Sequence, residues 1–197
     1  MKTRNLKKLA LILGTAFLLQ GCVTATVAGV AGAAAIGTKV ATDPRTTGTQ
    51  VDDEVLEEKV LSAIYKDEQI KSEGRVSVVS YSGRILLIGE VPNENLKDLA
   101  TGLAEGVDNV SKVYNELRIG SPISVSQIAK DSWITTQIKS KMFVNSGVKA
   151  TDVKVITENG EVFLMGNLTE EQADAATEVA RNVSGVAKVV KVFNYLN

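Results

Sequence analysis

The stretch GRILLIG at residues 83–89 returns as GEVFLMG at residues 160–166, a shift of 77 residues. In each case a glycine opens an apolar run of strand length. The residue before each glycine, Ser82 or Asn159, completes a two-residue turn, and Asn-Gly is a favoured type I′ pair. The repeated stretch therefore predicts a β-hairpin in each half of the chain.

The match extends to both sides of the hairpin, so the chain contains an internal repeat. Residues 53–65 (DEVLEEKVLSAIY) align with residues 131–143 (DSWITTQIKSKMF) at a shift of 78. Apolar residues recur there every four positions, which predicts a helix before each hairpin. A second helical segment follows each hairpin, and the capping-box sequence TEEQ at 169–172 opens it in the second repeat. Alternating segments at 110–119 and 186–196 predict the last strands.

Each repeat therefore has the order α-β-β-α-β, which predicts an α+β fold with two tandem αββαβ domains. We expect each domain to form a three-stranded mixed sheet with two helices packed on one face, the simplest two-layer arrangement. The second helices should each bury one apolar stripe, made of Leu96, Leu99, Leu103 and Val107 in the first repeat and of Ala173, Ala176, Ala180 and Val183 in the second.

Composition excludes most enzyme designs. The 197 residues include no histidine and one cysteine, so the chain cannot supply a Ser-His-Asp or Cys-His arrangement, a Cys/His zinc site or a histidine base. The formal net charge of −1 argues against nucleic-acid binding, which usually goes with a large basic excess. We therefore expect a non-enzymatic monomer with no catalytic residues, metal, cofactor or nucleic-acid partner.

The N-terminus has the pattern of a bacterial export signal. Four basic residues precede an apolar run at 9–19 that is too short to span a membrane comfortably, and a small residue follows. The sequence LQGC ending at Cys22 resembles the lipobox of bacterial lipoproteins, which implies cleavage before Cys22 and acylation of that cysteine. The residue after the cysteine is Val23 and not aspartate, which resembles the lipoproteins that are exported to the outer membrane. The protein would face the periplasm there. The alternative is an ordinary signal with an incidental free cysteine.

Composition and the repeat together predict the domain boundaries. Residues 23–50 are rich in Ala, Gly, Thr and Val, which predicts a flexible tether or, through the small residues at 29–37, a helix that packs against another helix. The expected order is a signal peptide at 1–21, an acylated Cys22 with its tether at 22–50, a first domain at 51–120, a linker at 121–126 and a second domain at 127–197. Removal of the signal leaves 18 basic and 23 acidic side chains, a net charge of −5.

The repeated αββαβ unit resembles the BON domain, a module of bacterial periplasmic and outer-membrane proteins. The resemblance covers the whole chain and rests on a glycine that closes the second strand of each repeat, Gly89 or Gly166, and on a Val-x-x-Val approach to the last strand. Its most specific stretches are residues 133–136 and 158–166. The family implies no catalysis. It implies recognition of anionic phospholipid, phosphatidylglycerol or cardiolipin, chiefly by the first helix of the second repeat, and a link to envelope integrity and the division site.

The residues of that helix indicate a surface suited to lipid. Its core stripe is Ile134, Ile138 and Met142, and a second stripe of aromatic and small polar residues, spaced by three, four and three positions, faces away from the core. Amphipathic rings settle at the headgroup level of a bilayer, where ammonium groups meet phosphates. The expected phospholipid-binding residues are the second stripe and its flanking lysines: Trp133, Thr136, Lys139, Ser140, Lys141 and Phe143.

The first repeat lacks this pattern. Residues 52–66 contain five carboxylates and two lysines, a net charge of −3, whereas residues 130–144 contain one carboxylate and three lysines, a net charge of +2. Only the first helix of the second repeat should therefore be attracted to an anionic membrane. Two other interpretations stay open: Trp133 as an apolar anchor between the domains, and the whole protein as an interaction scaffold for outer-membrane assembly proteins.

Overall fold

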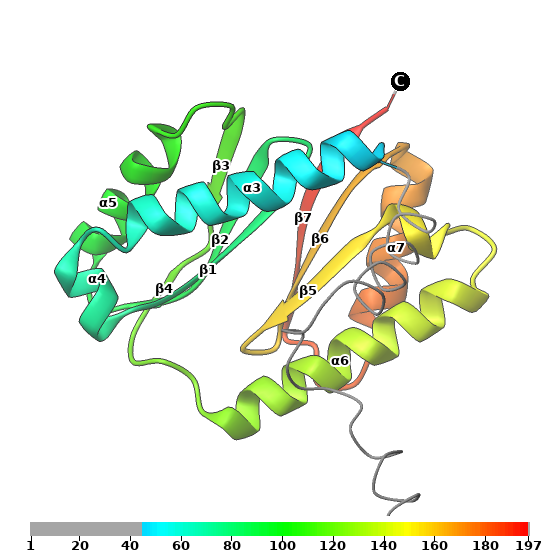
Figure 1. Cartoon of the computed structure of the whole chain (residues 1–197). Helices are drawn as coiled ribbons and strands as arrows, with labels where there is room; N and C mark the ends of the chain where they lie inside the picture. The colour runs from blue at the N-terminus through cyan, green and yellow to red at the C-terminus, as the bar shows by residue number, and fades with distance from the viewer. Residues whose placement is uncertain (1–44, 197) are drawn as a thin grey trace, which may run out of the picture. The chain divides into compact units, whose positions relative to one another are not determined.

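The structure, a computed structural model, describes residues 45–196, so the predicted signal peptide, Cys22 and most of the predicted tether lie outside the described residues. The first repeat consists of α3 (Thr47–Ile64), α4 (Glu68–Glu73), β1 (Arg75–Tyr81), β2 (Arg84–Val91), α5 (Glu94–Glu105), β3 (Lys112–Asn115) and β4 (Arg118–Ile119) (Figure 1). The second consists of α6 (Val125–Val144), the 3₁₀ helix η2 (Ala150–Asp152), β5 (Lys154–Glu158), β6 (Glu161–Leu168), α7 (Glu170–Arg181) and β7 (Lys188–Tyr195). The predicted αββαβ order is confirmed; α4 and η2 are additions to it, and β3 and β4 both lie within the strand predicted at 110–119.

Each repeat builds its sheet from an antiparallel hairpin and one parallel strand, as predicted. The strand orders are β1-β2-β3 and β5-β6-β7, and β4 adds a short pairing with β2. The last strand of the first repeat is not continuous over residues 110–119. The Asn115 side chain accepts a hydrogen bond from the Leu117 N–H at 3.0 Å and donates one to the Lys97 carbonyl at 2.8 Å. These bonds stabilise a break between β3 and β4, at which the Leu117 side chain enters the core.

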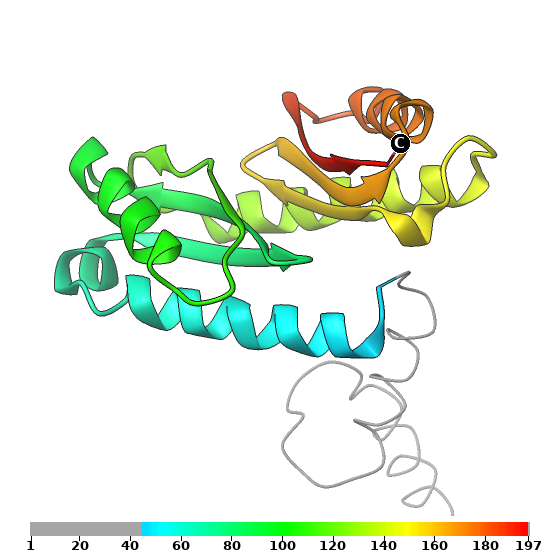
Figure 2. The same cartoon turned by 90° about the horizontal axis from the view of Figure 1, so that it is seen from above.

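Both helices of a repeat cover the same face of its sheet, and Figure 2 views them from above. The predicted α7 stripe is buried as expected, and the capping box at Thr169 and Gln172 is present. In α5 the prediction for Leu99 is wrong, because that side chain is 39% exposed. Ala100 and Ala104, four and eight residues after the buried Leu96, form the inward stripe instead. Leu103 and Val107 pack at the border of the core.

An aspartate of the first helix holds the hairpin turn in each repeat, and we call this contact the hairpin clamp. Asp53 accepts hydrogen bonds from the N–H groups of Ser82 at 2.7 Å and Gly83 at 2.9 Å. Asp131 accepts the equivalent bonds from Asn159 at 2.7 Å and Gly160 at 2.9 Å. All four turn residues have positive φ angles, as a type I′ turn requires. The clamps therefore join each helix to its hairpin at a fixed point.

The Asp53 clamp should make stability depend on pH. Burial raises the pKa of the Asp53 carboxyl, but hydrogen bonds from Gly83, Ser80, Ser82 and Arg45 outweigh burial and lower the pKa below its ordinary value. The ionised clamp thus stabilises the fold above the unfolded-state pKa of about 3.9. That contribution is lost as the pH falls through the folded-state pKa.

We expect Asp53→Asn to be less stable than the wild type at pH 7, and the difference to shrink below about pH 4. Urea unfolding of both proteins at several pH values measures it. A difference that stays constant down to pH 3 would contradict the role given to the carboxylate.

The first helix begins earlier than the predicted tether allows. The Thr46 hydroxyl caps α3 by accepting from the Thr49 N–H at 3.1 Å. The Arg45 guanidinium pairs with Asp53 at 2.5 Å and lies 4.3 Å from the centre of the Tyr81 ring. Residues 47–50 of the predicted tether therefore belong to α3. The N-cap at Thr46 determines where the helix begins, and the spacing of apolar residues does not show this position.

The linker between the repeats also ends two residues earlier than predicted. The Ser124 hydroxyl accepts from the Gln127 N–H at 3.2 Å, and α6 starts at Val125. Residues 125 and 126, assigned to the linker at 121–126, are helical. Between the repeats, the Glu90 carboxylate accepts from the Ile123 N–H at 3.4 Å, which fastens the linker to the first sheet.

The sheet faces opposite the helices pack against each other, and we call this contact the repeat interface. Its buried apolar members are Tyr81, Leu86 and Ile88 from the first repeat and Phe163, Met165 and Val192 from the second, bordered by Val79, Tyr114, Ile156 and Val190. Each sheet is therefore covered on both faces. Every buried member of the three apolar cores formed by the described residues lies between Leu56 and Phe193, so residues 45–197 contain all three of these cores.

Charged and polar contacts surround the repeat interface. Arg75 forms ion pairs with Glu90 of its own repeat and with Glu158 of the other. Arg84 at the start of β2 donates to Asn167 near the end of β6 at 2.9 Å. Other contacts between the repeats are Arg118 with Glu161 at 3.9 Å and Lys154 with Glu57 at 3.0 Å. These contacts pair charged and polar side chains where the apolar contact ends, although Arg84 Nε and Glu90 Oε1 are buried without a hydrogen-bond partner among the described residues.

Candidate lipid-binding helix

The helix α6 is fixed to the second repeat along one side only. Ile134, Ile138 and Met142 are buried, which confirms the predicted core stripe. The Asp131 clamp joins the helix to the β5–β6 turn, and Gln127 donates to the same carboxylate at 2.9 Å. These contacts hold α6 firmly while they leave its opposite side to solvent.

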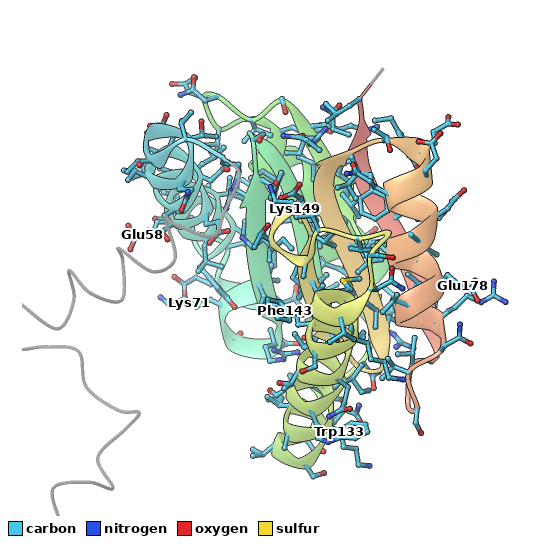
Figure 3. All side chains as sticks on the ribbon, turned by 90° about the vertical axis from the view of Figure 1, so that its right-hand side faces the viewer. Glu58, Lys71, Trp133, Phe143, Lys149 and Glu178 are labelled. Atoms are coloured by element: carbon cyan, nitrogen blue, oxygen red, sulfur yellow. The ribbon has the colours of Figure 1, made fainter. Side chains whose placement is uncertain are left out.

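The second stripe is exposed, as its spacing predicted. Trp133 is 53% exposed and Phe143 is 80% exposed, and Figure 3 shows both on α6. Thr136 and Ser140 are also exposed. Thr136 returns its hydroxyl hydrogen bond to the Ser132 carbonyl at 2.9 Å within the helix. The stripe therefore presents two rings with small, internally bonded neighbours.

Two further apolar residues lengthen this surface and were missed by the sequence analysis. Val125 is 83% exposed and Val144 is 82% exposed, one at each end of α6. A helical repeat of about 3.6 residues places Val125 on the same side as Phe143, and Val144 beside Trp133. The continued spacing was the available signal. We call the exposed residues Val125, Trp133, Thr136, Ser140, Phe143 and Val144 the outer stripe.

The two predicted lysines lie in different surroundings. Lys139 is exposed and has no hydrogen bond or ion pair with any of residues 45–196. Lys141 is exposed too, but its ammonium donates to the Asn182 carbonyl at the end of α7 at 3.4 Å. The structure thus brings Lys139 to one flank of the outer stripe and Lys141 to the other, next to α7.

The equivalent helix α3 has a different outer side. Val55 and Glu58 take the places of Trp133 and Thr136 and are exposed. Tyr65, in the place of Phe143, turns to the sheet, where its hydroxyl bonds to both the N–H and the carbonyl of Val76, at 3.0 and 3.2 Å. In the first repeat the ring at this position therefore binds the edge strand β1, whereas in the second repeat the equivalent ring, Phe143, is exposed.

Trp133 is not the anchor between the two repeats. Sheet residues form the repeat interface, and Trp133 does not belong to any buried cluster of the described residues. Within residues 45–196, no helix is long and apolar enough to cross a membrane. The same residues contain no group of three or more acidic or cysteine side chains that could hold a metal ion.

Comparison with known proteins identifies the family of both repeats. The family model described as "BON domain" matches residues 52–121 and 130–197. Over 100% of both chains, the sequence is 63% identical to the outer membrane lipoprotein DolP of Haemophilus influenzae. It is 60% identical to the 21 kDa hemolysin of Actinobacillus pleuropneumoniae over 78% of this chain and 79% of that one.

A third relative is less similar in sequence. The osmotically-inducible protein Y of Escherichia coli is 31% identical over 78% of this chain and 77% of its own length. None of these three relatives is named as an enzyme. Two BON matches that cover most of the chain, together with full-length similarity to a lipoprotein, establish its place: the chain belongs to the BON family, as a two-domain outer-membrane lipoprotein of the DolP kind.

Proposed function

We propose that the protein binds anionic phospholipid through the outer stripe of α6 while its acylated Cys22 anchors it to the outer membrane, on the periplasmic side. One observation carries this proposal: Trp133, Phe143, Val125 and Val144 are all more than half exposed on one side of a helix whose other side is firmly packed. Several large apolar side chains exposed together on one side of a helix are typical of a binding surface.

Charge favours an anionic membrane as the target. Lys139 and Lys141 flank the outer stripe, and Lys130 is exposed near the start of α6. Basic residues close to an anionic surface contribute about 1 kcal/mol each. The acidic helix α3 of the first repeat would be repelled by the same surface, so α6 alone provides the lipid contact.

The anchor and the stripe act together. Several acyl chains hold a protein at the bilayer, and the second contact then forms at a high effective concentration. A weak intrinsic affinity of α6 therefore suffices to enrich the protein in regions rich in phosphatidylglycerol or cardiolipin. We infer that this enrichment supports envelope integrity and underlies a position at the division site.

The sole tryptophan of the chain allows a direct test on residues 45–197. We expect the emission of Trp133 in buffer to be that of a solvated ring, since about half of its surface is exposed. Vesicles containing phosphatidylglycerol should shift the emission to the blue, and vesicles of phosphatidylcholine should not. Added salt should reverse the shift, because it screens the lysines.

The opposite result would favour the scaffold interpretation. Emission that is already blue in buffer and unchanged by either lipid means that Trp133 is covered by protein. The proposal for lipid would then be rejected, and the outer stripe would have to be examined as a contact for another envelope protein.

A further inference from the structure

A shallow hollow lies between the C-terminal half of α6 and the neighbouring helix α7. Its volume is about 460 Å³, and its walls are Lys141, Asn145, Ala175, Glu178, Val179 and Asn182. Ala175 and Val179 are half-buried against the core of the second repeat and give the hollow an apolar floor. Glu178 projects from α7 in Figure 3.

The charges around this hollow leave a positive group available to an anion. The Glu178 carboxylate is paired with Arg181 at 3.2 Å and also accepts from the Asn182 amide at 2.8 Å. The Lys141 ammonium has one contact, the Asn182 carbonyl, and no carboxylate partner among the described residues. The carbonyls that end a helix attract cations, so this contact keeps the ammonium at the wall.

Amide groups provide hydrogen bonds beside the ammonium. The Asn145 oxygen accepts from the Gly147 N–H at 2.8 Å, while its amide nitrogen has no partner within residues 45–196. The Asn182 nitrogen is used twice on Glu178, while its side-chain oxygen accepts no bond from the same residues. One donor and one acceptor therefore remain near Lys141.

The hollow has the right depth relative to the outer stripe. Lys141 and Asn145 are sequence neighbours of Phe143 and Val144, the most exposed pair at this end of α6. An interfacial helix buries its apolar side by about 5–10 Å, and a helix with side chains is about 10–12 Å across. When the outer stripe enters the bilayer, the flank of α6 that borders the hollow lies among the headgroups.

We propose that this hollow binds the headgroup of an anionic phospholipid that carries free hydroxyls. The phosphodiester contacts the Lys141 ammonium, and the polyol lies over Ala175 and Val179 with its hydroxyls toward Asn145 and Asn182. The inference rests on the proposed function and adds a second property to it. Charge attracts the protein to any anionic surface, and the hollow selects phosphatidylglycerol among anionic lipids.

Two lysines of α6 provide a matched test. Lys141→Gln and Lys139→Gln each remove one exposed charge from the same helix, but only Lys141 borders the hollow. Binding of residues 45–197 is measured with vesicles of phosphatidylglycerol and of phosphatidylserine at equal anionic content. Lys139→Gln should weaken both by about fivefold, the effect of one basic residue at an anionic surface. Lys141→Gln should weaken binding to the phosphatidylglycerol vesicles severalfold more than binding to the phosphatidylserine vesicles.

The free headgroup gives a second measurement that does not require a membrane. Glycerophosphoglycerol should shift the backbone amide resonances of Asn145, Ala175, Val179 and Asn182, and inorganic phosphate should shift only those near Lys141. The proposal is overturned if both lysine variants lose affinity equally for both lipids, or if the headgroup shifts none of these resonances.

The experiments distinguish rejection of headgroup binding in the hollow from rejection of lipid binding by α6 as a whole. If Lys141→Gln shows no lipid preference but Trp133→Glu still removes vesicle binding, the outer stripe binds lipid without headgroup selection. If Trp133→Glu leaves binding unchanged, the proposed function itself is rejected, and the hollow with it.

Discussion

Trp133→Glu will weaken the binding of residues 45–197 to phosphatidylglycerol vesicles by roughly a hundredfold. The loss of an aromatic ring from the bilayer interface accounts for about 2 kcal/mol. A carboxylate brought close to an anionic surface adds about 1 kcal/mol, and each 1.4 kcal/mol is a factor of about ten. Vesicle sedimentation measures the change, and urea unfolding should show almost no change in stability, since Trp133 is 53% exposed.

The repeat provides a matched control for this substitution. Val55 occupies the place of Trp133 on α3 and is 44% exposed. Val55→Glu introduces the same carboxylate at the same position of the same fold, on the helix that is already acidic. Binding to vesicles should be unchanged. Equal losses in the two variants would show that overall charge, and not the α6 surface, determines binding.

Gly89→Ala will destabilise the protein by about 3 kcal/mol or more. Gly89 has a φ of +117°, a region that side chains other than hydrogen rarely adopt. A Cβ atom there would overlap the backbone carbonyl oxygen of Arg75 on the paired strand β1. Because backbone atoms form the obstacle, neither strand can relieve the overlap without losing the register of Arg75 and Val76 with the end of β2. Urea unfolding measures the loss.

The same substitution at Gly102 should raise the stability of the protein instead of lowering it. It lies inside α5, and a Cβ atom there meets nothing within 4 Å. Alanine is preferred to glycine in a helix by about 1 kcal/mol, so Gly102→Ala should stabilise the protein by that amount. If both variants are destabilised alike, the steric explanation for Gly89 is wrong.

Local spacing was sufficient to predict the αββαβ order and four of the six residues of the outer stripe, Trp133, Thr136, Ser140 and Phe143. The hairpins, the capping box at Thr169 and the exposure of Trp133 and Phe143 follow from contacts over a few residues. These features depend on backbone geometry and helical period, which the sequence displays directly. The error at Leu99 arose because two alanines can form a core stripe as well as leucines do.

The repeat interface was not predicted, although a signal was present. Ile85, Leu86, Leu87 and Ile88 are consecutive apolar residues, which in a strand point alternately to both faces. A strand apolar on both faces must be covered on both. The partner of the second face lies in the other repeat, and spacing within one repeat cannot identify it. The contact of Lys141 with the end of α7 was missed for a different reason: its partner, Asn182, lies in the same repeat but 41 positions further along the chain.

The repeat interface also describes how the two halves are related. Leu86, Ile88 and Val79 correspond to Phe163, Met165 and Ile156 at the repeat shift of 77, and all six belong to the same cluster. Arg84 at the start of β2 reaches the end of β6, and Glu161 at the start of β6 reaches Arg118 beside the end of β2.

This is the reciprocity of an isologous dimer, in which two identical subunits meet through the same patch. The chain has the architecture of such a dimer with its two subunits fused. In a homodimer, every change on one outer helix is copied onto the other. Fusion removes that constraint, so one molecule can carry a basic, aromatic helix and an acidic one on otherwise equivalent halves.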